Sequence, residues 1–429
     1  MNEANKPKQT FRIGFSRSNI SCIPGHPLAG YAGCRACSEN HDPLLIQCMV
    51  LLDDEDHCAV YVSLDLLAVD DFIMNRVKRM LEEADFFYDV LIFQAIHTHC
   101  APAGLLQTDR GFLKAAQYFA GKPNTTLMLN LCNLIVLTIL DAKWNAIPAR
   151  FYKASGKVEN FASNRVEGKV IESPVFVIEA ENRQRKACFV FAANHPTVLG
   201  ADTTESSADY VYGLRKQLEE AGYSDVFFLN GPCGDLSCRY TRKSSDFEEA
   251  QRLGRLLGEG ALKALESKEL FSPCLADLTT LDIFLPACEI PGMEEAETAL
   301  KESVGNYEKA KAEGADALRL RELHVEIETA QVMVQKANIS LPSDEIPIQS
   351  LVWKWDGETF VTYPGELFST LPFLQDPHVH VLCYCNGYNL YLADESAYEN
   401  QVYEALCSPF SRKAAEVYNE AISLCLKNR

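Results

Sequence analysis

The fold class is decided by three consecutive segments, AVYVSL (59–64), NRVKRMLEEA (75–84) and DVLIFQAI (89–96). The first and last are short apolar runs rich in β-branched residues, which is typical of buried strands. The middle segment is polar, with apolar residues at helical spacing, and predicts a helix. A strand, a helix and a second strand in this order form a β-α-β unit, so this stretch predicts an α/β protein.

The same alternation of strands and helices continues along the chain. Residues 174–180 and 187–195 predict two strands joined by the polar turn ENRQRK. Residues 209–222 predict a helix, and DVFFLN (225–230) predicts the strand that follows it. Residues 126–144 form a long apolar segment that predicts a buried or amphipathic helix. We find no internal repeat and no low-complexity linker that would divide the chain.

Residues 292–337 differ in composition from the rest of the chain. They are rich in Glu, Ala and Lys, with apolar residues at helical spacing, and predict two helices that break near Gly314. We interpret this segment as a helical insertion in a single domain. A solvated hairpin is one interpretation, and a lid or dimerisation arm is the other.

The overall composition limits the class of protein. The 429 residues are 47% apolar and 23% charged, which excludes a disordered, collagen-like or coiled-coil chain. The net charge of −19 opposes binding to nucleic acid and to anionic membranes. The N-terminus lacks a signal-peptide pattern, and the apolar stretch 131–140 is too short to span a bilayer. We therefore expect a cytoplasmic chain with reduced thiols and no stable membrane insertion, although a mature secreted form would look similar. A homo-oligomer is compatible with the sequence.

Several common functional motifs are absent from the sequence. There is no HExxH zinc-protease helix, no GxSxG elbow, no P-loop and no GxGxxG fingerprint. Cys34 and Cys37 form a single CxxC pair, and without a second pair we interpret them as incidental thiols.

Histidines stand at the ends of two predicted strands. His97 and His99 lie two residues apart, so on a strand both side chains point the same way. His195 follows a second strand and precedes a proline. Strand ends that lead into loops are where α/β sheets place their functional sites. His378 and His380 lie within a strand, and we interpret this second pair as structural.

Three later motifs carry further polar groups. The Gly-rich turn NGPCGDLSCR contains Ser237, and the turn YPGE contains Glu366. Glycines in such turns let the backbone approach a ligand closely. A polar stretch near the C-terminus contributes the tyrosines Tyr388, Tyr391, Tyr398 and Tyr403.

The order of these motifs resembles the neutral ceramidase family, the zinc-dependent hydrolases that cleave N-acyl-sphingosine. The resemblance rests on HTHCAPAG, NR, NHPT, NGPCGDLSCR, YPGE, NGYNLY and VYE, and extends to the opening IGFSRSNISCIPGHPLAGYAG. It implies one catalytic domain over residues 1–429, built from two packed mixed β-sheets flanked by α-helices. We expect the insertion 292–337 to lie within this domain. Members of the family carry a further C-terminal domain, whereas this sequence ends soon after the last motif, so we expect no C-terminal accessory domain here.

The resemblance implies a metal centre with one Zn²⁺ per chain. Its ligands would be His97, His195, Glu366 and Tyr391. Histidine nitrogens and carboxylate oxygens suit zinc, which leaves a position for water in catalytic sites. Zinc lowers the pKa of such a water to roughly 7, which makes hydroxide available for attack on an amide carbonyl.

The resemblance also implies four catalytic residues, His99, Ser237, Arg165 and Tyr403. His99 would protonate the leaving amine, and Tyr403 or Arg165 would stabilise the oxyanion. Ser237 is either a nucleophile or a group that orients water or substrate, and we favour the orienting role. Arg165 is alternatively a partner for a carboxylate or phosphate of the substrate.

The substrate and three other assignments stay open at this stage. We expect a small-molecule or lipid-like N-acyl substrate, of which ceramide is one candidate. The alternative is a metal-dependent hydrolase on the same scaffold that acts on a soluble amide or ester. A non-catalytic binding protein and a metal-free serine hydrolase are the alternatives from other classes. Asp65 is a candidate hydrogen-bond partner for a liganding histidine. We also hypothesise an oxidant-sensitive pocket from the thiols near the motifs, namely Cys100, Cys233, Cys238, Cys383 and Cys385.

Overall fold

A computed structural model describes residues 10–341 and 343–428 of the chain. Its largest element is a mixed sheet with the strand order β4-β3-β2-β1-β5-β6-β7-β8. These strands are β1 (Phe11–Ile20), β2 (Leu44–Leu52), β3 (Cys58–Leu64), β4 (Val90–Ala95), β5 (Ile147–Asn164), β6 (Lys169–Asn182), β7 (Lys186–Ala192) and β8 (Asp225–Asn230). β3 pairs with β4, and β7 with β8, in parallel, whereas the strands between these pairs are antiparallel. The short strands β9 (Leu236–Ser237) and β10 (Glu269–Phe271) also pair with β5.

A second, smaller sheet faces the first. It contains β11 (Leu278–Pro286), β12 (Glu345–Trp355), β13 (Glu358–Thr362) and β15 (Val379–Leu382). A separate pair is formed by β14 (Glu366–Leu367) and β16 (Tyr391–Leu392), which run parallel. Aromatic and aliphatic side chains from both sheets form one continuous core cluster between them, which includes Phe189, Phe227 and Phe360. The predicted α/β fold with two packed mixed sheets is therefore confirmed.

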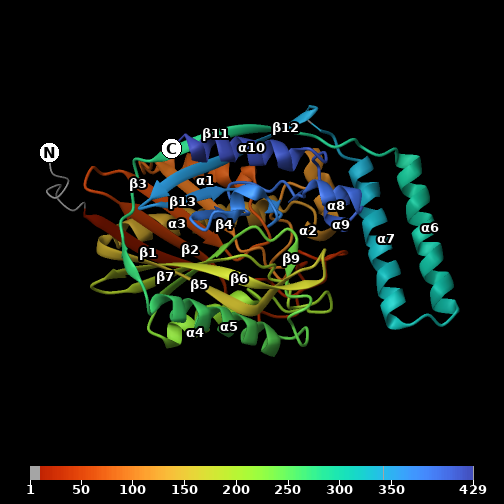
Figure 1. Cartoon of the computed structure of the whole chain (residues 1–429), viewed down its shortest axis with the longest axis horizontal. Helices are drawn as coiled ribbons and strands as arrows, with labels where there is room; N and C mark the ends of the chain where they lie inside the picture. Colours follow the sequence, from red (N-terminus) through yellow and green to blue (C-terminus); the bar gives the residue numbers. More distant parts are fainter. Residues whose placement is uncertain (1–9, 342, 429) are drawn as a thin grey trace.

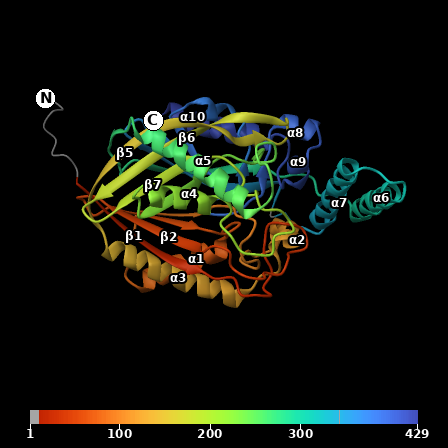
Figure 2. The same ribbon diagram turned by 90° about the horizontal axis from the view of Figure 1, so that it is seen from below.

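Helices cover the outer faces of the sheets (Figures 1 and 2). α3 (Thr125–Trp144) packs on β1 and β2 and contacts α1 (Asp71–Glu83). α4 (Tyr210–Glu220) and α5 (Phe247–Leu265) pack on each other, and α5 lies on β5 and β6. α10 (Ala414–Lys427) packs on β11 of the smaller sheet. Short helical segments complete the structure: η2 (Gly111–Ala116), α2 (Gln117–Ala120), η3 (Pro372–Gln375), α8 (Glu395–Glu399) and α9 (Tyr403–Cys407).

The helical insertion forms a hairpin that projects from the body of the molecule (Figure 1). Its helices are α6 (Met293–Ala312) and α7 (Ala317–Ala337), and Gly314 lies between them at φ +76°. A positive φ favours glycine, so the chain breaks where the sequence predicts. α6 is the outer helix, and among its residues only Ala296 is buried. α7 contacts η2 and α9, which brings it next to the site described below.

Within the described residues, α3 is the one helix with the length and apolar composition of a membrane span. One side of α3 is buried against the large sheet, through residues such as Leu131, Ile135 and Ile139. A core helix of this kind passes the same test of length and composition, so the finding is weak evidence for a membrane.

Candidate metal centre

The predicted metal ligands converge from four separate strand ends. His97 follows β4, and His195 follows β7. Glu366 and Tyr391 begin β14 and β16, and they are directly paired across these two parallel strands. Residues almost 300 positions apart in the chain therefore meet at one place. This place lies beyond the carboxyl ends of β4 and β7, where open α/β sheets bind ligands.

Backbone carbonyls fix the orientation of two imidazoles. The Nδ1 atom of His97 lies 2.8 Å from the carbonyl oxygen of Leu67, and Nδ1 of His195 lies 2.9 Å from that of Leu236. Each Nδ1 therefore carries the proton and donates to a carbonyl, which leaves the Nε2 lone pair free. The two Nε2 atoms lie 3.5 Å and 2.9 Å from one carboxylate oxygen of Glu366. The three side chains thus present nitrogen and oxygen donors to a common point.

The carboxylate of Glu366 is held from its other side by Tyr388. The Tyr388 hydroxyl donates to the second carboxylate oxygen at 2.6 Å, and both residues are buried. Burial by itself would raise the pKa of Glu366, but the neighbouring His97 and His195 outweigh it and hold the pKa well below its usual range. Burial lowers the pKa of His195 to about 4, assisted by the charge of Arg165. An ionised carboxylate beside a neutral imidazole is the state that binds a metal ion.

His99 completes a group of three histidines. Its Nε2 atom lies 3.2 Å from Nε2 of His97, and ligand atoms of His97, His99 and His195 all lie within 4.8 Å of one another. Burial, followed by the two neighbouring imidazoles, lowers the pKa of His99 well below its usual range. Its Nδ1 atom is buried and has no hydrogen-bond partner among the described residues. The group can hold a metal ion.

The loop that carries His99 is held by the N-terminal part of the chain. The guanidinium of Arg35 donates to the His99 carbonyl at 2.8 Å, and the Tyr31 ring meets the imidazole edge-on at 5.2 Å. Gly30 has a φ of +105°, and a Cβ at this position would lie 2.4 Å from the Cβ of His99. Only glycine fits such a close approach with this backbone conformation.

Arg165 supports Tyr391 from within the protein. A guanidinium N–H donates to the Tyr391 hydroxyl at 3.3 Å and to the Gly234 carbonyl at 2.7 Å. The Nε atom of Arg165 lies 2.8 Å from a carboxylate oxygen of Glu404. Burial would lower the pKa of Arg165, but Glu404 and Tyr391 raise it well above its usual range. The carboxylate of Glu404 balances the charge of Arg165, and the guanidinium contacts the hydroxyl of Tyr391. This arrangement counts against the alternative in which Arg165 pairs with a carboxylate of the substrate.

Ser237 lies beside His195, but its hydroxyl contacts the backbone of Arg239. The two residues form an isolated parallel β-bridge, and Ser237 is buried in β9. Its hydroxyl oxygen accepts a hydrogen bond from the backbone N–H of Arg239 at 3.3 Å. Its backbone carbonyl accepts from the hydroxyl of Ser163 at 2.7 Å. The catalytic role of Ser237 stays a prediction.

Three of the candidate metal ligands, His97, Glu366 and Tyr391, line a pocket of about 440 Å³ with a mixed polar and apolar wall. His97, His99, Glu366 and the tyrosines form its polar part, which includes Tyr403, whose ring meets Tyr391 edge-on at 6.4 Å. Val332 of α7 and Phe119 of α2 contribute apolar wall. A second hollow lies between the α6–α7 hairpin and α9, lined by residues such as Met333 and Leu406, and it also reaches Tyr403. The inserted hairpin therefore helps to enclose the pocket.

The described structure is similar to two solved ceramidase structures. The crystal structure of neutral ceramidase from Pseudomonas aeruginosa matches with a TM-score of 0.73 and 16% identity, over 98% of this chain and 75% of that chain. A ceramidase solved in complex with C2 matches with a TM-score of 0.70 and 15% identity, over 98% and 76%. The chain has the neutral ceramidase fold. No protein-family model matches the chain, and no curated protein matches it in sequence.

Within this ceramidase fold, two site residues escaped the sequence interpretation. The sequence marks Tyr388 as one tyrosine of a polar stretch and assigns it no role, although its hydroxyl donates a hydrogen bond to Glu366. Glu404 is the last residue of the motif VYE, but the sequence assigns it no role, although it pairs with Arg165. The available signal is their place in the quoted motifs, because NGYNLY contains Tyr388 and VYE ends at Glu404.

Asp65 has a different role from the predicted one. Its carboxylate accepts two hydrogen bonds from the guanidinium of Arg215, at 2.5 Å and 2.7 Å, and one from the backbone N–H of Leu45 at 2.8 Å. These partners occupy both oxygens of a fully buried carboxylate. Asp65 is a structural ion-pair residue of the ceramidase fold, and the prediction that it supports a histidine is wrong.

The thiols near the motifs are buried, which weakens the hypothesis of an oxidant-sensitive pocket. Cys100, Cys233, Cys238, Cys383 and Cys385 are all buried. Burial raises the pKa of the Cys100 and Cys238 thiols to about 12. A protonated thiol shielded from water is a poor nucleophile, so these side chains act as small core residues.

Proposed function

We propose that this protein is a zinc-dependent amidohydrolase that cleaves the N-acyl amide bond of a lipid-like substrate. The observation that carries the proposal is the convergence of the free Nε2 atoms of His97 and His195 on the carboxylate of Glu366. Imidazole nitrogen and carboxylate oxygen match the ligands of catalytic zinc sites. The neutral ceramidase fold supports the class of reaction.

The donor set fits zinc, with His97, His195 and Glu366 as ligands and Tyr391 as the fourth. A bound Zn²⁺ would supply a Lewis acid for the carbonyl and lower the pKa of a water molecule. His99 lies within hydrogen-bond distance of His97 and can carry a proton from the attacking water to the leaving nitrogen. Tyr403 lines the same pocket, and its hydroxyl is a candidate donor to the oxyanion. One such donor typically contributes about 10²–10³ in rate.

The lipid-like character of the substrate is supported by the apolar part of the pocket wall. Val332, Phe119 and Leu390 line it beside the polar groups. Such side chains match an acyl or alkyl chain better than a charged substrate. The pairing of Arg165 with Glu404 removes the main argument for an anionic soluble substrate.

Metal content tests the first half of the proposal. The purified protein is expected to contain about one zinc per chain by mass spectrometry, and a His97→Ala/His195→Ala variant is expected to contain none. His378→Ala is the matched control, because His378 is 65% exposed and its partner is Glu358, which is not among the proposed ligands. No bound zinc after reconstitution, or equal loss in the control, would contradict the metal mechanism.

Hydrolysis tests the second half. The zinc-loaded protein should release fatty acid from a long-chain N-acylsphingosine in mixed micelles faster than acetate from a soluble N-acetyl amine. A preference for the soluble amide or for an ester would overturn the lipid-like substrate while leaving the metal centre intact.

A further inference from the structure

Two cysteines outside the metal centre contact each other. Cys22, Leu28 and Cys37 form a small buried cluster of their own, separate from the two larger core clusters. The side chain of Cys22 is hydrogen-bonded to the thiol of Cys37. Both cysteines are free thiols in the structure. They form a thiol pair for which the function proposed above has no use.

The partner of Cys37 is not the one that the CxxC spacing suggests. In that motif Cys37 follows Cys34, but the Cys34 thiol is turned toward α2, where it donates to the carbonyl of Tyr118 at 3.9 Å. The thiol of Cys37 donates at 3.3 Å to the carbonyl of Glu39. Its sulfur therefore faces Cys22, which precedes the motif in the chain.

Hydrogen bonds to the backbone hold both cysteines in place. The Asn40 side chain accepts from the N–H of Cys22 at 2.9 Å and donates to its carbonyl at 3.0 Å. The N–H of Cys37 donates to the carbonyl of His26 at 2.8 Å, and its carbonyl accepts from the N–H of Gly25 at 2.7 Å. A disulfide forms readily only between cysteines whose side chains already face each other at short range. The fixed backbone keeps the two thiols in that arrangement.

Cys22 and Cys37 stand at the two ends of a loop that backs the metal pocket. Within this loop, residues 23–36, Gly30 lines the pocket. The guanidinium of Arg35 donates to the carbonyl of His99 at 2.8 Å. Opening of the loop would break these contacts. A covalent link between its two ends would make such opening rarer, because it removes conformations from the open state.

We propose that Cys22 and Cys37 form a disulfide in an oxidising environment and that this bond fastens the loop to the wall of the metal pocket. The oxidant is a low-molecular-weight disulfide. The thiolate of one cysteine attacks it, which gives a mixed disulfide and releases one thiol. The other cysteine then attacks the protein sulfur of the mixed disulfide and releases the second thiol. Two protein thiols are oxidised, the external disulfide is reduced to two thiols, and the two protein protons pass to the leaving thiolates. The bond is independent of the proposed hydrolase activity.

Burial makes this reaction slow in the folded protein. Both cysteines are buried, and burial, followed by the hydrogen bond to Cys37, raises the pKa of Cys22 well above its usual value, so little thiolate is present. The cover is thin, because the residues on both sides of each cysteine, 21, 23, 36 and 38, are exposed. Local opening of the loop brings the thiols to solvent, and we expect the disulfide to form over minutes to hours. In a reducing compartment the pair stays as two thiols.

Peptide mapping tests which cysteines are joined. The purified protein is incubated with oxidised glutathione, its remaining thiols are blocked with N-ethylmaleimide, and it is digested with trypsin without reduction. Cleavage after Arg17 and Arg35 places Cys22 and Cys34 in one peptide and Cys37 in the next. The two peptides should stay joined in the unmodified protein and in Cys34→Ser, and should separate in Cys22→Ser and in Cys37→Ser. A link that survives Cys22→Ser but not Cys34→Ser would assign the bond to the CxxC motif and overturn the proposal. Separate peptides in the unmodified protein would overturn it equally.

Amide hydrogen exchange tests whether the bond fastens the loop, and it compares the unmodified protein in two redox states, so that no variant has to fold. The N–H groups of Ala29 and Gly30 each donate to a backbone carbonyl at 2.8 Å, so their exchange reports opening of the loop. Exchange in residues 23–36 should slow severalfold on oxidation, and dithiothreitol should restore it.

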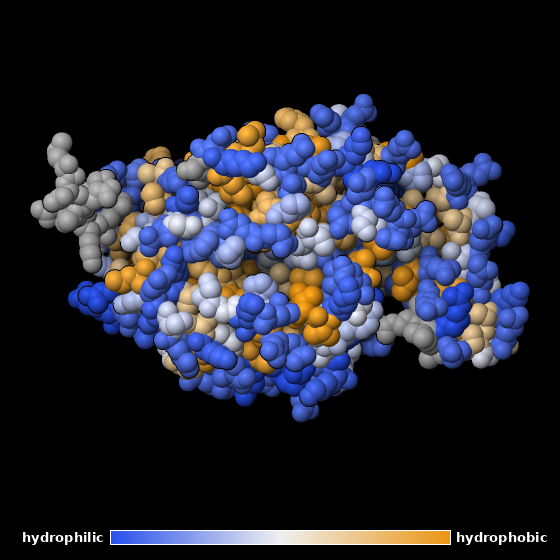
Figure 3. Space-filling view, viewed as in Figure 1, coloured by the Kyte–Doolittle hydropathy of each residue, from blue (hydrophilic) through white to orange (hydrophobic). Residues whose placement is uncertain are grey.

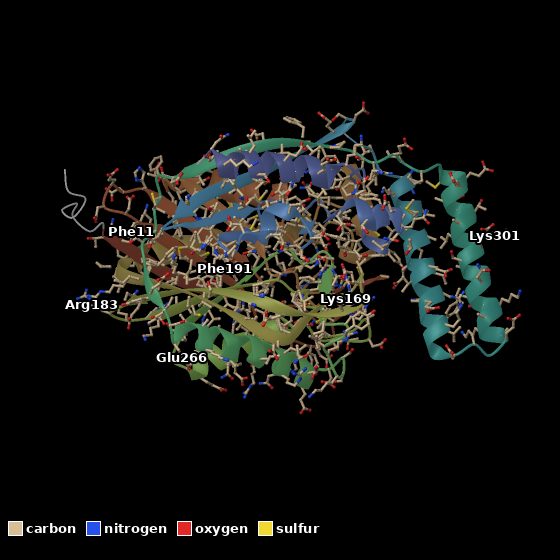
Figure 4. The ribbon with its side chains drawn as sticks, viewed as in Figure 1. Phe11, Lys169, Arg183, Phe191, Glu266 and Lys301 are labelled. Atoms are coloured by element: carbon tan, nitrogen blue, oxygen red, sulfur yellow. The ribbon has the colours of Figure 1, made fainter. Side chains whose placement is uncertain are left out.

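The outer helix α6 is the internal control for this measurement. It carries Lys301 and stands apart from the body of the molecule (Figure 4), and its surface is largely hydrophilic (Figure 3). Its exchange should not change on oxidation. Equal slowing in α6, or unchanged exchange in residues 23–36 once the peptides are joined, would refute the idea that the disulfide fastens the loop.

Discussion

The hydrogen bond from Tyr388 to Glu366 yields the sharpest prediction about the metal centre. Tyr388→Phe removes one hydroxyl and keeps the ring that lines the pocket. The lost bond joins a phenol to a buried carboxylate at 2.6 Å, and a hydrogen bond to a charged group contributes about 1.5–3 kcal/mol. Without it, Glu366 is free to turn away from the Nε2 atoms of His97 and His195. At about 1.4 kcal/mol per tenfold, the expected loss of zinc affinity is roughly 10- to 100-fold.

A competition titration against a fluorescent zinc chelator measures this loss. Tyr398→Phe is the matched control, because it deletes a hydroxyl that donates at 2.8 Å to the backbone carbonyl of Phe410. The control should retain the affinity of the unmodified protein. Unchanged affinity in Tyr388→Phe, or an equal loss in Tyr398→Phe, would refute the idea that the phenol positions Glu366.

Three further predictions concern stability. Gly30→Ala should lower the free energy of unfolding by about 2 kcal/mol or more in a urea titration, because the new Cβ would stand at a positive φ and clash with His99. Zinc binding should weaken as well. A urea midpoint equal to that of the unmodified protein would contradict this prediction. Asp65→Ala should lower the free energy of unfolding by about 3–5 kcal/mol in the same assay, because it leaves the buried guanidinium of Arg215 without its carboxylate partner. A loss below about 1 kcal/mol would show that the ion pair is not needed for stability. In the folded protein the pKa of Glu358 is about 2, below its usual value near 4.5. Ionised Glu358 therefore contributes about 2 kcal/mol to the free energy of unfolding at neutral pH, and this contribution is lost as the pH falls from about 4.5 toward 2. Glu358→Gln should therefore be less stable at pH 7 and converge with the unmodified protein near pH 2, and a gap that does not change with pH would contradict the assignment.

The pKa of Glu358 has an identifiable cause outside the metal centre. Burial alone would raise it, but hydrogen bonds from His380 at 2.8 Å and Lys153 at 2.9 Å outweigh burial. His380 also stacks on Phe176 at 3.9 Å. These contacts support the structural role predicted for the histidine pair 378 and 380.

Periodicity predicts those elements whose apolar pattern is unambiguous. The strand predicted at 225–230 coincides with β8, and the helix predicted at 126–144 differs from α3 by one residue. The sequence does not predict the strand β2, because its nine residues are all buried and, apart from Gln47, apolar, and such a run does not separate a strand from a buried helix. The strand β5 was missed because a bulge between Val158 and Ala162 interrupts its alternation.

The candidate site was predictable only in part, for a reason of topology. Histidines at strand ends signal a site by themselves, but their meeting with Glu366 depends on how distant strands pair. The order of motifs supplied that information through the family resemblance. Tyr388 and Glu404 stand in two of these motifs, NGYNLY and VYE, but the resemblance gives them no role, since each acts through a neighbouring side chain and a single sequence does not mark such contacts.

The origin of the candidate metal ligands in four separate strand ends also bears on the lifetime of the protein in a cell. An ion held by His97, His195 and Glu366 would cross-link segments that lie apart in the chain and are free to separate in the unfolded state. Binding at a thousandfold excess over the dissociation constant adds about 4 kcal/mol to folding stability. That is a large share of the 5–15 kcal/mol that keeps a typical domain folded. The supply of metal would then govern how often the chain unfolds and is degraded. A shortage of metal would lower the amount of protein as well as the fraction of sites that hold an ion.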